Sequence, residues 1–327
     1  MCGIGGYYRT GNTNEQAPRW AKPAMRRLWD ALQSRGTDAS GIAYESPTGT
    51  RHYKRDIPAF ELSPLGTNMA FGMNRAPRWV MLHTRASTHG SPELNRNNHP
   101  LMGHKLALCH NGVVYNKDSV LNQFNTVAQR EVDTEAILVA LKSGGINAVA
   151  KHVKGSMSIS WAKGKTMFLW TNGKSPLVIG ELYNGDYMYA STDELLMTTN
   201  LKFKNVYDAK IGHLYKFTAR GLHVSKTYFK EDKSNSLSWR DFSGFDTTKP
   251  TRVTYKPRNG QQKLVVPKVN YIHKKKKLRH SDVCNPKEQG SDSVCNPFDA
   301  EYDWDSVYGD WRTWEKKSNQ IKEWEDE

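Results

Sequence analysis

The residue that first suggests chemistry is Cys2, the second residue of a chain that begins Met-Cys-Gly-Ile-Gly-Gly. A cysteine at this position allows the initiator Met1 to be removed, which would leave one residue with both a thiol and a free α-amine. The reference pKa of that amine is about 7.7–8.0, so the amine can act as a general base toward its own thiol. Taken alone, the position of Cys2 is better explained by chance, and the hypothesis of a self-activated nucleophile depends on the rest of the chain.

Polar clusters that follow short apolar segments supply candidate binding groups. The apolar runs at 79–82 and 106–109 predict buried strands, and polar residues follow them at 83–90 and 110–116. A third cluster, Asn-Asn-His-Pro, lies at 97–100. Side chains at strand ends can converge on a ligand, so we expect these clusters to contribute to one site.

Some of these residue types have specific chemical uses. An arginine such as Arg85 can bind a carboxylate through its guanidinium fork. The pair Asn111 and Gly112 offers the side-chain amide and the backbone N–H of an oxyanion hole. Simpler structural roles stay open for some of them. An Asn-Gly pair more often forms a hairpin turn, and isolated histidines such as His83, His89 and His99 are more often hydrogen-bonded structural residues than catalysts.

Taken together and in order, these motifs resemble the class II glutamine amidotransferases. This N-terminal-nucleophile family includes the glutaminase domains of glucosamine-6-phosphate synthase, amidophosphoribosyltransferase and asparagine synthetase. The resemblance covers about the first two-thirds of the chain. Its motifs are Cys-Gly-Ile at 2–4, Arg-Gly-x-Asp-x-x-Gly at 35–41, His-Thr-Arg…Thr-His-Gly at 83–90, Asn-x-His-Pro at 97–100, His-Asn-Gly at 110–112, Asp-Thr-Glu at 133–135, and two similar later segments at 175–177 and 189–194.

The resemblance implies hydrolysis of glutamine to glutamate and ammonia, with Cys2, Asn111 and Gly112 as catalytic residues. The Cys2 thiolate would attack the side-chain amide carbon of glutamine while its own amine carries the proton. The Asn111 side chain and the Gly112 N–H would hold the oxyanion, and water would hydrolyse the resulting thioester. The resemblance implies no cofactor and no metal for this chemistry.

The resemblance also implies how glutamine is bound. Arg85 would bind the α-carboxylate and Asp133 the α-ammonium, and a site with both groups selects an amino acid over a plain amide. Thr88 and His89 would line the pocket, and Arg35 would brace the surroundings of the nucleophile. For Asp133 a structural role stays open as well, because it precedes an apolar-periodic segment and could cap the N-terminus of a helix.

One position departs from the family pattern. The family commonly has a tryptophan directly after the arginine of the His-Thr-Arg motif, and here Ala86 stands at that place. The loop that bears this residue usually closes over bound glutamine. With a small side chain there, we expect closure to exclude water less completely.

Length, composition and cysteine usage fit an intracellular enzyme domain with an appendage. The chain has 327 residues and a formal net charge of +14. Four cysteines without a secretory segment argue against a disulfide framework and for a reducing compartment, so we expect a cytoplasmic protein. No apolar run approaches the ~20 residues that a membrane span requires, so no membrane contact is expected.

The residues after 230 differ sharply in charge. Residues 251–280 hold ten basic and no acidic side chains, whereas residues 281–327 hold five basic and 13 acidic side chains. A basic stretch is most often solvated, but on a basic domain it also suits a nucleic acid partner. The acidic end could instead fold back and mask the basic stretch.

Two further patterns occur in this part of the chain. A short segment is repeated around Cys284 and Cys295, and because its spacing matches no zinc site, a duplicated turn-rich linker accounts for it better. Aromatic residues recur at near-helical spacing among acidic residues in 304–327. That pattern predicts an amphipathic helix, which would pack on its own domain or on a partner.

We therefore expect three regions: a glutamine amidotransferase domain at 2–230, a basic and then turn-rich linker at 231–303, and an acidic amphipathic helix at 304–327. The resemblance implies an α+β fold for the domain, a four-layer α/β/β/α sandwich of two antiparallel sheets, followed by an extended, partly disordered C-terminal tail. The sequence predicts helices at 20–34 and 134–143, and strands at 157–161, 166–170, 187–190 and 213–217.

The expected function is glutamine hydrolysis that supplies ammonia to an acceptor. The residues after 230 are too few and too polar for a synthase domain, so we expect the acceptor enzyme to be a separate partner protein, with nucleotide or nucleic-acid modification as the first-ranked pathway. Two alternatives stay open. One is an N-terminal-nucleophile amidase for another amide, which convergence of Arg85 and Asp133 on one pocket would disfavour. The other is a non-catalytic binding or assembly protein.

Overall fold

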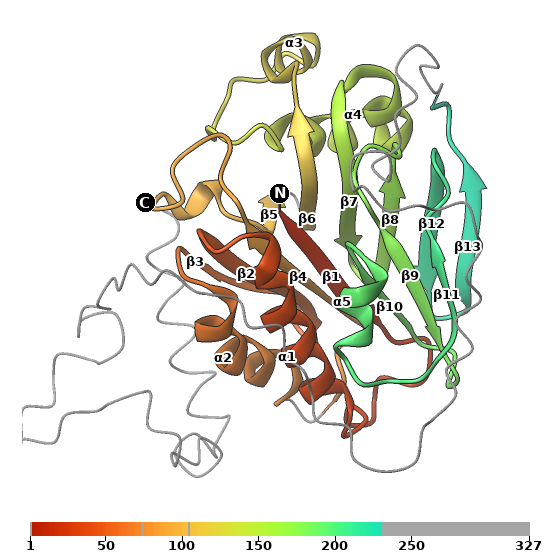
Figure 1. Cartoon of the computed structure of the whole chain (residues 1–327). Helices are drawn as coiled ribbons and strands as arrows, with labels where there is room; N and C mark the ends of the chain where they lie inside the picture. Colours follow the sequence, from red (N-terminus) through yellow and green to blue (C-terminus); the bar gives the residue numbers. More distant parts are fainter. Residues whose placement is uncertain (1, 73–74, 104, 230–327) are drawn as a thin grey trace, which may run out of the picture. The chain divides into compact units, whose positions relative to one another are not determined.

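The computed structural model describes residues 2–72, 75–103 and 105–229 of the chain. In this part of the chain, two antiparallel sheets lie between helices and form an α+β unit (Figure 1). The expected fold class is therefore confirmed. The expected linker at 231–303 and the expected helix at 304–327 lie outside the described residues, and both stay predictions.

The first sheet has β1 in its interior. Its strand order is β11-β9-β10-β1-β4-β2-β3, with antiparallel neighbours throughout. Its strands are β1 (Gly3–Tyr8), β2 (Ala39–Ser46), β3 (Gly49–Arg55), β4 (Trp79–Arg85), β9 (Val178–Leu182), β10 (Tyr187–Ala190) and β11 (Phe203–Asp208).

The second sheet is a meander of hairpins with one long connection between β8 and β12. Its strand order is β13-β12-β8-β7-β6-β5, again with antiparallel neighbours. Its strands are β5 (Leu101–Gly103), β6 (Leu106–Val114), β7 (Gly155–Lys163), β8 (Thr166–Thr171), β12 (His213–Thr218) and β13 (Gly221–Lys226).

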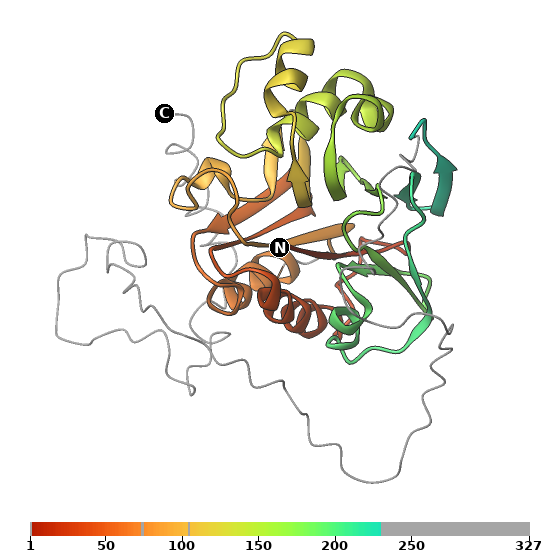
Figure 2. The ribbon, with the colours of Figure 1, turned by 45° about the horizontal axis from the view of Figure 1, so that its top comes forward.

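Helices cover the outer face of each sheet, so the domain has four layers (Figure 2). Helices α1, α2 and α5 lie on the seven-stranded sheet, and α3 and α4 lie on the six-stranded sheet. Within the described ranges, none of the helices is both long and apolar enough to cross a membrane. The helices are α1 (Ala21–Leu32), α2 (Ala59–Phe71), α3 (Lys117–Gln123), α4 (Glu135–His152) and α5 (Asp193–Met197), with short 3₁₀ turns η1 (Gln33–Arg35) and η2 (Asn95–Asn97).

Three hydrophobic cores correspond to the three interfaces between these layers. The middle core joins the two sheets, with Ile4 and Met81 from one sheet and Cys109 and Phe217 from the other. The outer cores join each sheet to its helices. Side chains alternate between the faces of a strand. Every second residue counted from Ile4 on β1, from Met81 on β4 or from Cys109 on β6 therefore faces the layer between the sheets.

Gly6 in β1 makes room for a buried aromatic ring in this middle layer. Gly6 pairs with Tyr189 of β10, and the Tyr189 side chain is buried with 1% exposure. A Cβ at Gly6 would overlap both the Tyr189 ring and the carbonyl oxygen of Val80. Only glycine therefore fits at this position of the strand.

The secondary structure predicted from sequence is confirmed at the positions named above. The predicted helix at 20–34 corresponds to α1 with η1, and the predicted strands correspond to β4, β6, β7, β8, β10 and β12. The predicted helix at 134–143 is the first part of α4. Its backbone leaves the helical conformation at Gly144 and Gly145 and then continues as a further helical segment.

We predict that Gly6→Ala destabilises the domain by about 1–3 kcal/mol, because the new methyl group overpacks a closed interior. Gly11→Ala is the matched control, since a Cβ at Gly11 meets nothing within 4 Å. Thermal unfolding of the two variants measures the difference. Equal melting temperatures would show that the Tyr189 ring moves aside without cost.

Candidate active site

Cys2 lies directly before β1, at the edge of the sandwich where β4 ends. The register that pairs Gly3 with Thr84 places Cys2 beside Arg85. The Cys2 Sγ donates to the carbonyl oxygen of Ala86 at 3.6 Å. Burial raises the pKa of the Cys2 thiol, while this contact and the charge of Arg85 act in the opposite direction. The group is thus a thiol at neutral pH and needs a base before it can attack.

The Arg-Gly-x-Asp-x-x-Gly motif holds the segment around Cys2 and Ala86. The Arg35 Nε donates to the Cys2 carbonyl oxygen at 3.0 Å. Gly36 lies so close to the backbone of Ala86 that a Cβ would overlap it. The Asp38 carboxylate accepts from the backbone N–H of Ser87 at 2.7 Å. The motif therefore fixes both the backbone of Cys2 and the start of the loop that follows β4.

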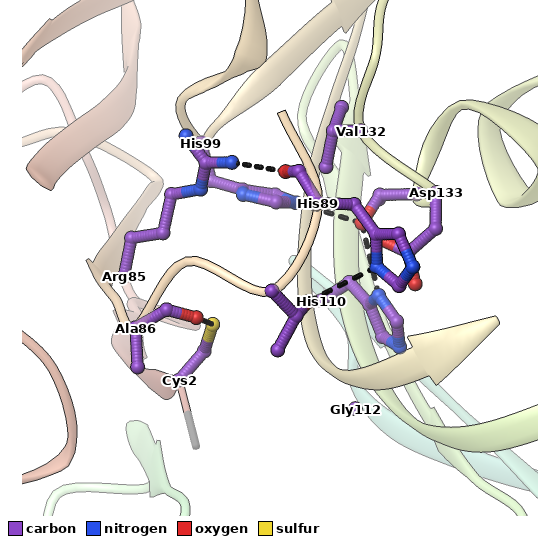
Figure 3. A pocket seen from close by; sticks show the side chains of 11 residues that line it. Cys2, Arg85, Ala86, His89, His99, His110, Gly112, Val132 and Asp133 are labelled. Atoms are coloured by element: carbon purple, nitrogen blue, oxygen red, sulfur yellow. Dashed lines mark hydrogen bonds between the residues drawn. The ribbon is translucent and has the colours of Figure 1, made fainter. Parts of the chain in front are cut away.

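Arg85 is the last residue of β4 and has 2% exposure. Its Nη1 donates to the Asn98 side chain at 2.7 Å, and its Nη2 donates to the carbonyl oxygens of His89 at 2.5 Å and Gly90 at 2.8 Å. Both N–H groups of Nη2 are thereby committed to the loop that follows β4, and Figure 3 shows the bond to His89. Arg85 lies at the pocket and at the same time anchors the loop, which carries Thr88 and His89.

Asp133 lies at the pocket, directly before α4. Its Oδ2 accepts from the backbone N–H of Val114 at 2.5 Å. The N-cap position of α4 is Thr134, and no side chain caps the helix there. The alternative interpretation of Asp133 as the helix N-cap is therefore wrong. Its carboxylate joins the end of β6 to the start of α4 instead.

Asn111 and Gly112 lie inside β6, so the alternative interpretation of this pair as a hairpin turn is wrong. Gly112 has φ +146°, and a Cβ there would overlap the carbonyl oxygen of Ser156 on β7. Asn111 has 0% exposure. It lies two residues after Cys109 on β6, so its side chain also faces the layer between the sheets. Neither polar atom of its amide has a hydrogen-bond partner within the described part of the chain. Such a buried amide can serve a ligand atom at low desolvation cost.

The structure brings six of the eight predicted site residues to one pocket. Arg35 and Asn111 do not line it: Arg35 bonds the Cys2 backbone, and Asn111 lies fully buried. The six residues that line the pocket are Cys2, Arg85, Thr88, His89, Gly112 and Asp133, joined there by Ala86, His99, His110, Val132 and Thr134 (Figure 3).

Three histidines form a buried polar cluster that the sequence did not predict, and two of them, His99 and His110, line the pocket. The His83 and His99 rings stack with centroids 4.2 Å apart, and the His83 Nε2 lies 3.1 Å from the His110 carbonyl oxygen. The Thr134 Oγ1 lies 3.1 Å from the His99 Nε2 and 2.9 Å from the His110 Nδ1. His83 and His99 are thus hydrogen-bonded, as the interpretation of them as structural residues requires, and their part in any reaction stays a prediction.

Burial keeps this cluster uncharged. It lowers the pKa of His83 to about 3 and also lowers the pKa values of His99 and His110. All three rings are therefore neutral near pH 7. In the described ranges, no group of three or more His, Cys, Asp or Glu side chains is arranged to hold a metal ion.

Comparisons with known proteins agree on one family. A family model described as a glutamine amidotransferase domain matches residues 83–198. The glutamine–fructose-6-phosphate aminotransferase (isomerizing) of Halalkalibacterium halodurans is 26% identical over 229 residues, which cover 64% of this chain and 35% of that protein. The protein of the same name from Shouchella clausii is 27% identical over 227 residues with the same coverage. The chain thus matches about a third of the length of these relatives.

A solved structure supports the same fold. The glutamine phosphoribosylpyrophosphate amidotransferase from B. subtilis, complexed with ADP and GMP, superposes with a TM-score of 0.53 and 20% sequence identity. The match covers 69% of this chain and 49% of that one. At this identity the likeness is evidence for the fold.

We predict that Arg85→Lys loosens the loop at 86–98, because one ammonium cannot replace three hydrogen bonds to Asn98, His89 and Gly90. Backbone amides of this loop should exchange hydrogen faster, as measured by mass spectrometry. Arg96→Lys is the matched control within the same loop. Its side chain is 60% exposed and lies 3.9 Å from Glu131, so its loss should leave exchange unchanged. Equal protection in both variants would contradict the anchoring role of Arg85.

Proposed function

We propose, because this chain belongs to the class II glutamine amidotransferases, that it hydrolyses glutamine through a Cys2 thioester and supplies the released ammonia to an acceptor enzyme. The observation that carries the proposal is the convergence of a thiol, a guanidinium and a carboxylate on one pocket, from Cys2, Arg85 and Asp133. That convergence favours glutamine over a plain amide, since an amino acid offers an α-carboxylate and an α-ammonium.

The nucleophile in this proposal is the processed N-terminal cysteine. Removal of Met1 frees the α-amine of Cys2, whose reference pKa of about 7.7–8.0 suits a base near neutral pH. Because burial raises the pKa of the Cys2 thiol, the thiol needs an adjacent base to remove its proton. The amine takes the thiol proton as Sγ attacks the side-chain carbonyl carbon of glutamine.

The oxyanion of the tetrahedral intermediate is held by the Asn111 side-chain amide and the Gly112 N–H. The protonated amine then gives its proton to the leaving nitrogen, and ammonia departs as the thioester forms. Water adds to the thioester carbonyl in the second half of the reaction, with the amine as base. That step releases glutamate and regenerates the thiol.

Recognition of glutamine involves Arg85 and the loop that it anchors. Two N–H groups of Arg85 bind the carbonyl oxygens of His89 and Gly90, so the substrate carboxylate either uses the remaining N–H groups or displaces a loop carbonyl. Asp133 keeps its carboxylate at the pocket through the Val114 N–H and can bind the α-ammonium. Thr88 shapes the rim of the pocket.

The acceptor in this proposal is a separate partner protein, and we rank nucleotide or nucleic-acid modification in the cytoplasm first among its pathways. Charge supports the ranking. Besides the basic stretch at 251–280, hairpin turns at one end of the six-stranded sheet carry exposed basic side chains: Lys105, Lys163, Lys165 and Arg220.

These basic turns are regularly arranged and lie far from Cys2. Neighbouring hairpins in a sheet are about 10 Å apart, twice the strand spacing, so the turns form a row of positive charge. The hydroxyl of Tyr8, the last residue of β1, donates to the Lys165 carbonyl oxygen at 3.0 Å. Because Cys2 precedes the first residue of β1, a polyanion bound at the row leaves the pocket uncovered.

The nucleophile assignment gives a direct test. We predict that Cys2→Ala abolishes glutamine hydrolysis and covalent labelling by a diazo-ketone analogue of glutamine, while the fold persists. Cys109→Ala is the control, because Cys109 is fully buried in the middle core and burial raises the pKa of its thiol. Mass spectrometry of the labelled chain locates the adduct. Labelling of Cys109 in place of Cys2 would contradict the assignment of Cys2 as the nucleophile.

The oxyanion assignment gives a second test within the same assay. We predict that Asn111→Ala lowers kcat by on the order of 10²–10³-fold with a modest change in KM, as removal of an oxyanion donor does. Steady-state kinetics of glutamine hydrolysis measures both constants. A variant whose KM rises while its kcat stays unchanged would place Asn111 in ground-state binding instead.

The charge argument gives a third test on the full chain. We predict that Lys163→Glu with Lys165→Glu and Arg220→Glu weakens binding to a duplex DNA probe. Each lost phosphate contact should lower the slope of log K against log salt by about 0.9. Fluorescence anisotropy over a salt series measures this slope. The control replaces three exposed lysines on other elements by Glu: Lys142, Lys151 and Lys202. Equal losses in both variants, or a wild-type chain that binds no nucleic acid, would contradict the proposal.

A further inference from the structure

We propose that Thr134 is a positioning residue whose hydroxyl holds the oxyanion donors and the Asp133 carboxylate in register with each other. The inference rests on the proposed function and deepens it. Thr134 has 1% exposure and lies between Asp133 and the start of α4. Its Oγ1 contacts two histidines from different segments, His99 and His110.

The direction of each hydrogen bond follows from the partners. The His110 Nε2 lies 3.1 Å from the Ser156 carbonyl oxygen, which can only accept, so this nitrogen carries the proton. The ring is neutral, and its Nδ1 is therefore an acceptor that receives the Thr134 hydroxyl proton at 2.9 Å. The Thr134 oxygen in turn accepts from the protonated His99 Nε2 at 3.1 Å.

A second carbonyl fixes the remaining ring of the cluster. The His83 Nε2 faces the His110 carbonyl oxygen at 3.1 Å, so it too carries its proton at Nε2. His83 stacks on His99 and lies two residues before Arg85 on β4. One set of proton positions thus satisfies every contact of the cluster, and it requires three neutral rings.

This chain of hydrogen bonds ends on the atom that confines Gly112. The Ser156 carbonyl oxygen accepts from His110 and is also the atom that a Cβ at Gly112 would overlap. On the other side, the Asp133 Oδ2 accepts from the Val114 N–H, two residues after Gly112. The Thr134 hydroxyl therefore links β6, which carries Gly112, to the segment before α4, which carries Asp133.

Loss of the hydroxyl should change chemistry and binding together. Without it, the His110 Nδ1 and the His99 Nε2 proton lose their common partner, and β6 can shift against the start of α4. We expect Thr134→Val to lower kcat by on the order of 10–100-fold, because small misplacements of catalytic groups are costly. It should raise KM as well, because Asp133 moves with Thr134. Thr134→Ser keeps the hydroxyl and should restore both constants to within about threefold of wild type.

A matched control separates positioning from general stability. Thr67 in α2 also has 0% exposure, and its Oγ1 donates to the Ser63 carbonyl oxygen at 2.6 Å. Thr67→Val removes a comparable buried hydrogen bond away from the pocket. It should lower the melting temperature while leaving kcat and KM for glutamine unchanged.

The experiment measures glutamine hydrolysis and thermal unfolding for the full-length wild type and the three variants. Nitrogen-15 NMR of the histidine-labelled wild type adds a readout that needs no variant, and it should find the proton on Nε2 of His83, His99 and His110. Normal kcat and KM in Thr134→Val, equal activity loss in Thr67→Val or Thr134→Ser, or a proton on Nδ1 of His110 would each overturn the positioning role. A wild-type chain that does not hydrolyse glutamine would reject the proposed function itself, together with this role.

Discussion

The site depends on one geometric constraint. The strands β1, β4 and β6 reach the same edge of the sandwich, and each of them turns its candidate site residue toward the layer between the sheets. Side chains alternate along each strand, so only every second residue faces the layer between the sheets. On β4 these are the residues in step with Met81, which include Arg85 at the strand end. On β6 they are in step with Cys109 and include Asn111. Cys2 has the parity of Ile4. A slip of one residue in any of the three strands would turn its functional side chain out of this layer.

Burial of so many polar groups at one edge has a cost that the surrounding motifs offset. Each buried polar atom without a partner costs about 1–3 kcal/mol. The Arg-Gly-x-Asp-x-x-Gly motif supplies partners for the backbone of Cys2 and Ser87, and Thr134 supplies partners for two histidines. Asn111 is the contrasting case, because its amide is buried and unpartnered within the described residues. Single buried atoms of His83, His99 and Ser87 also lack partners, but among the described residues only the Asn111 side chain has two such atoms, which suits it to a substrate atom.

Several helices and strands could be predicted from the apolar pattern of the sequence, whereas the four-layer fold was implied by the resemblance to the family. The apolar runs before residues 83 and 110 are β4 and β6, and the helix predicted to end at Ser143 breaks at Gly144. Helix α2 was not predicted, and the reason is visible in its sequence. It contains Pro64 and Gly66, which disfavour a helix interior, yet a Cβ on Gly66 would lie 2.6 Å from the Trp29 ring. Packing on α1 therefore overrides local propensity.

The site was only partly predictable, for a related reason. Residue type and order marked Cys2, Arg85 and Asp133, and these three do line one pocket. The hydrogen-bond chain through Thr134 was not foreseen, because its partners come from segments 24 and 35 residues away. The Asn-Gly pair at 111–112 was ambiguous, because the same dipeptide suits a turn. Only the neighbouring β7, with the Ser156 carbonyl oxygen against Gly112, explains why glycine follows Asn111 inside a strand.

The loop after β4 joins these constraints to substrate binding. Ala86 gives this loop a small side chain beside Cys2, and its carbonyl oxygen accepts from the thiol. The hydrogen bonds from Arg85 to the carbonyl oxygens of His89 and Gly90 hold the loop in position. In the proposed function, a substrate carboxylate that binds Arg85 either uses the remaining N–H groups or displaces one of those carbonyls. In the second case, binding of glutamine would also release the loop, so that one guanidinium would couple the two events.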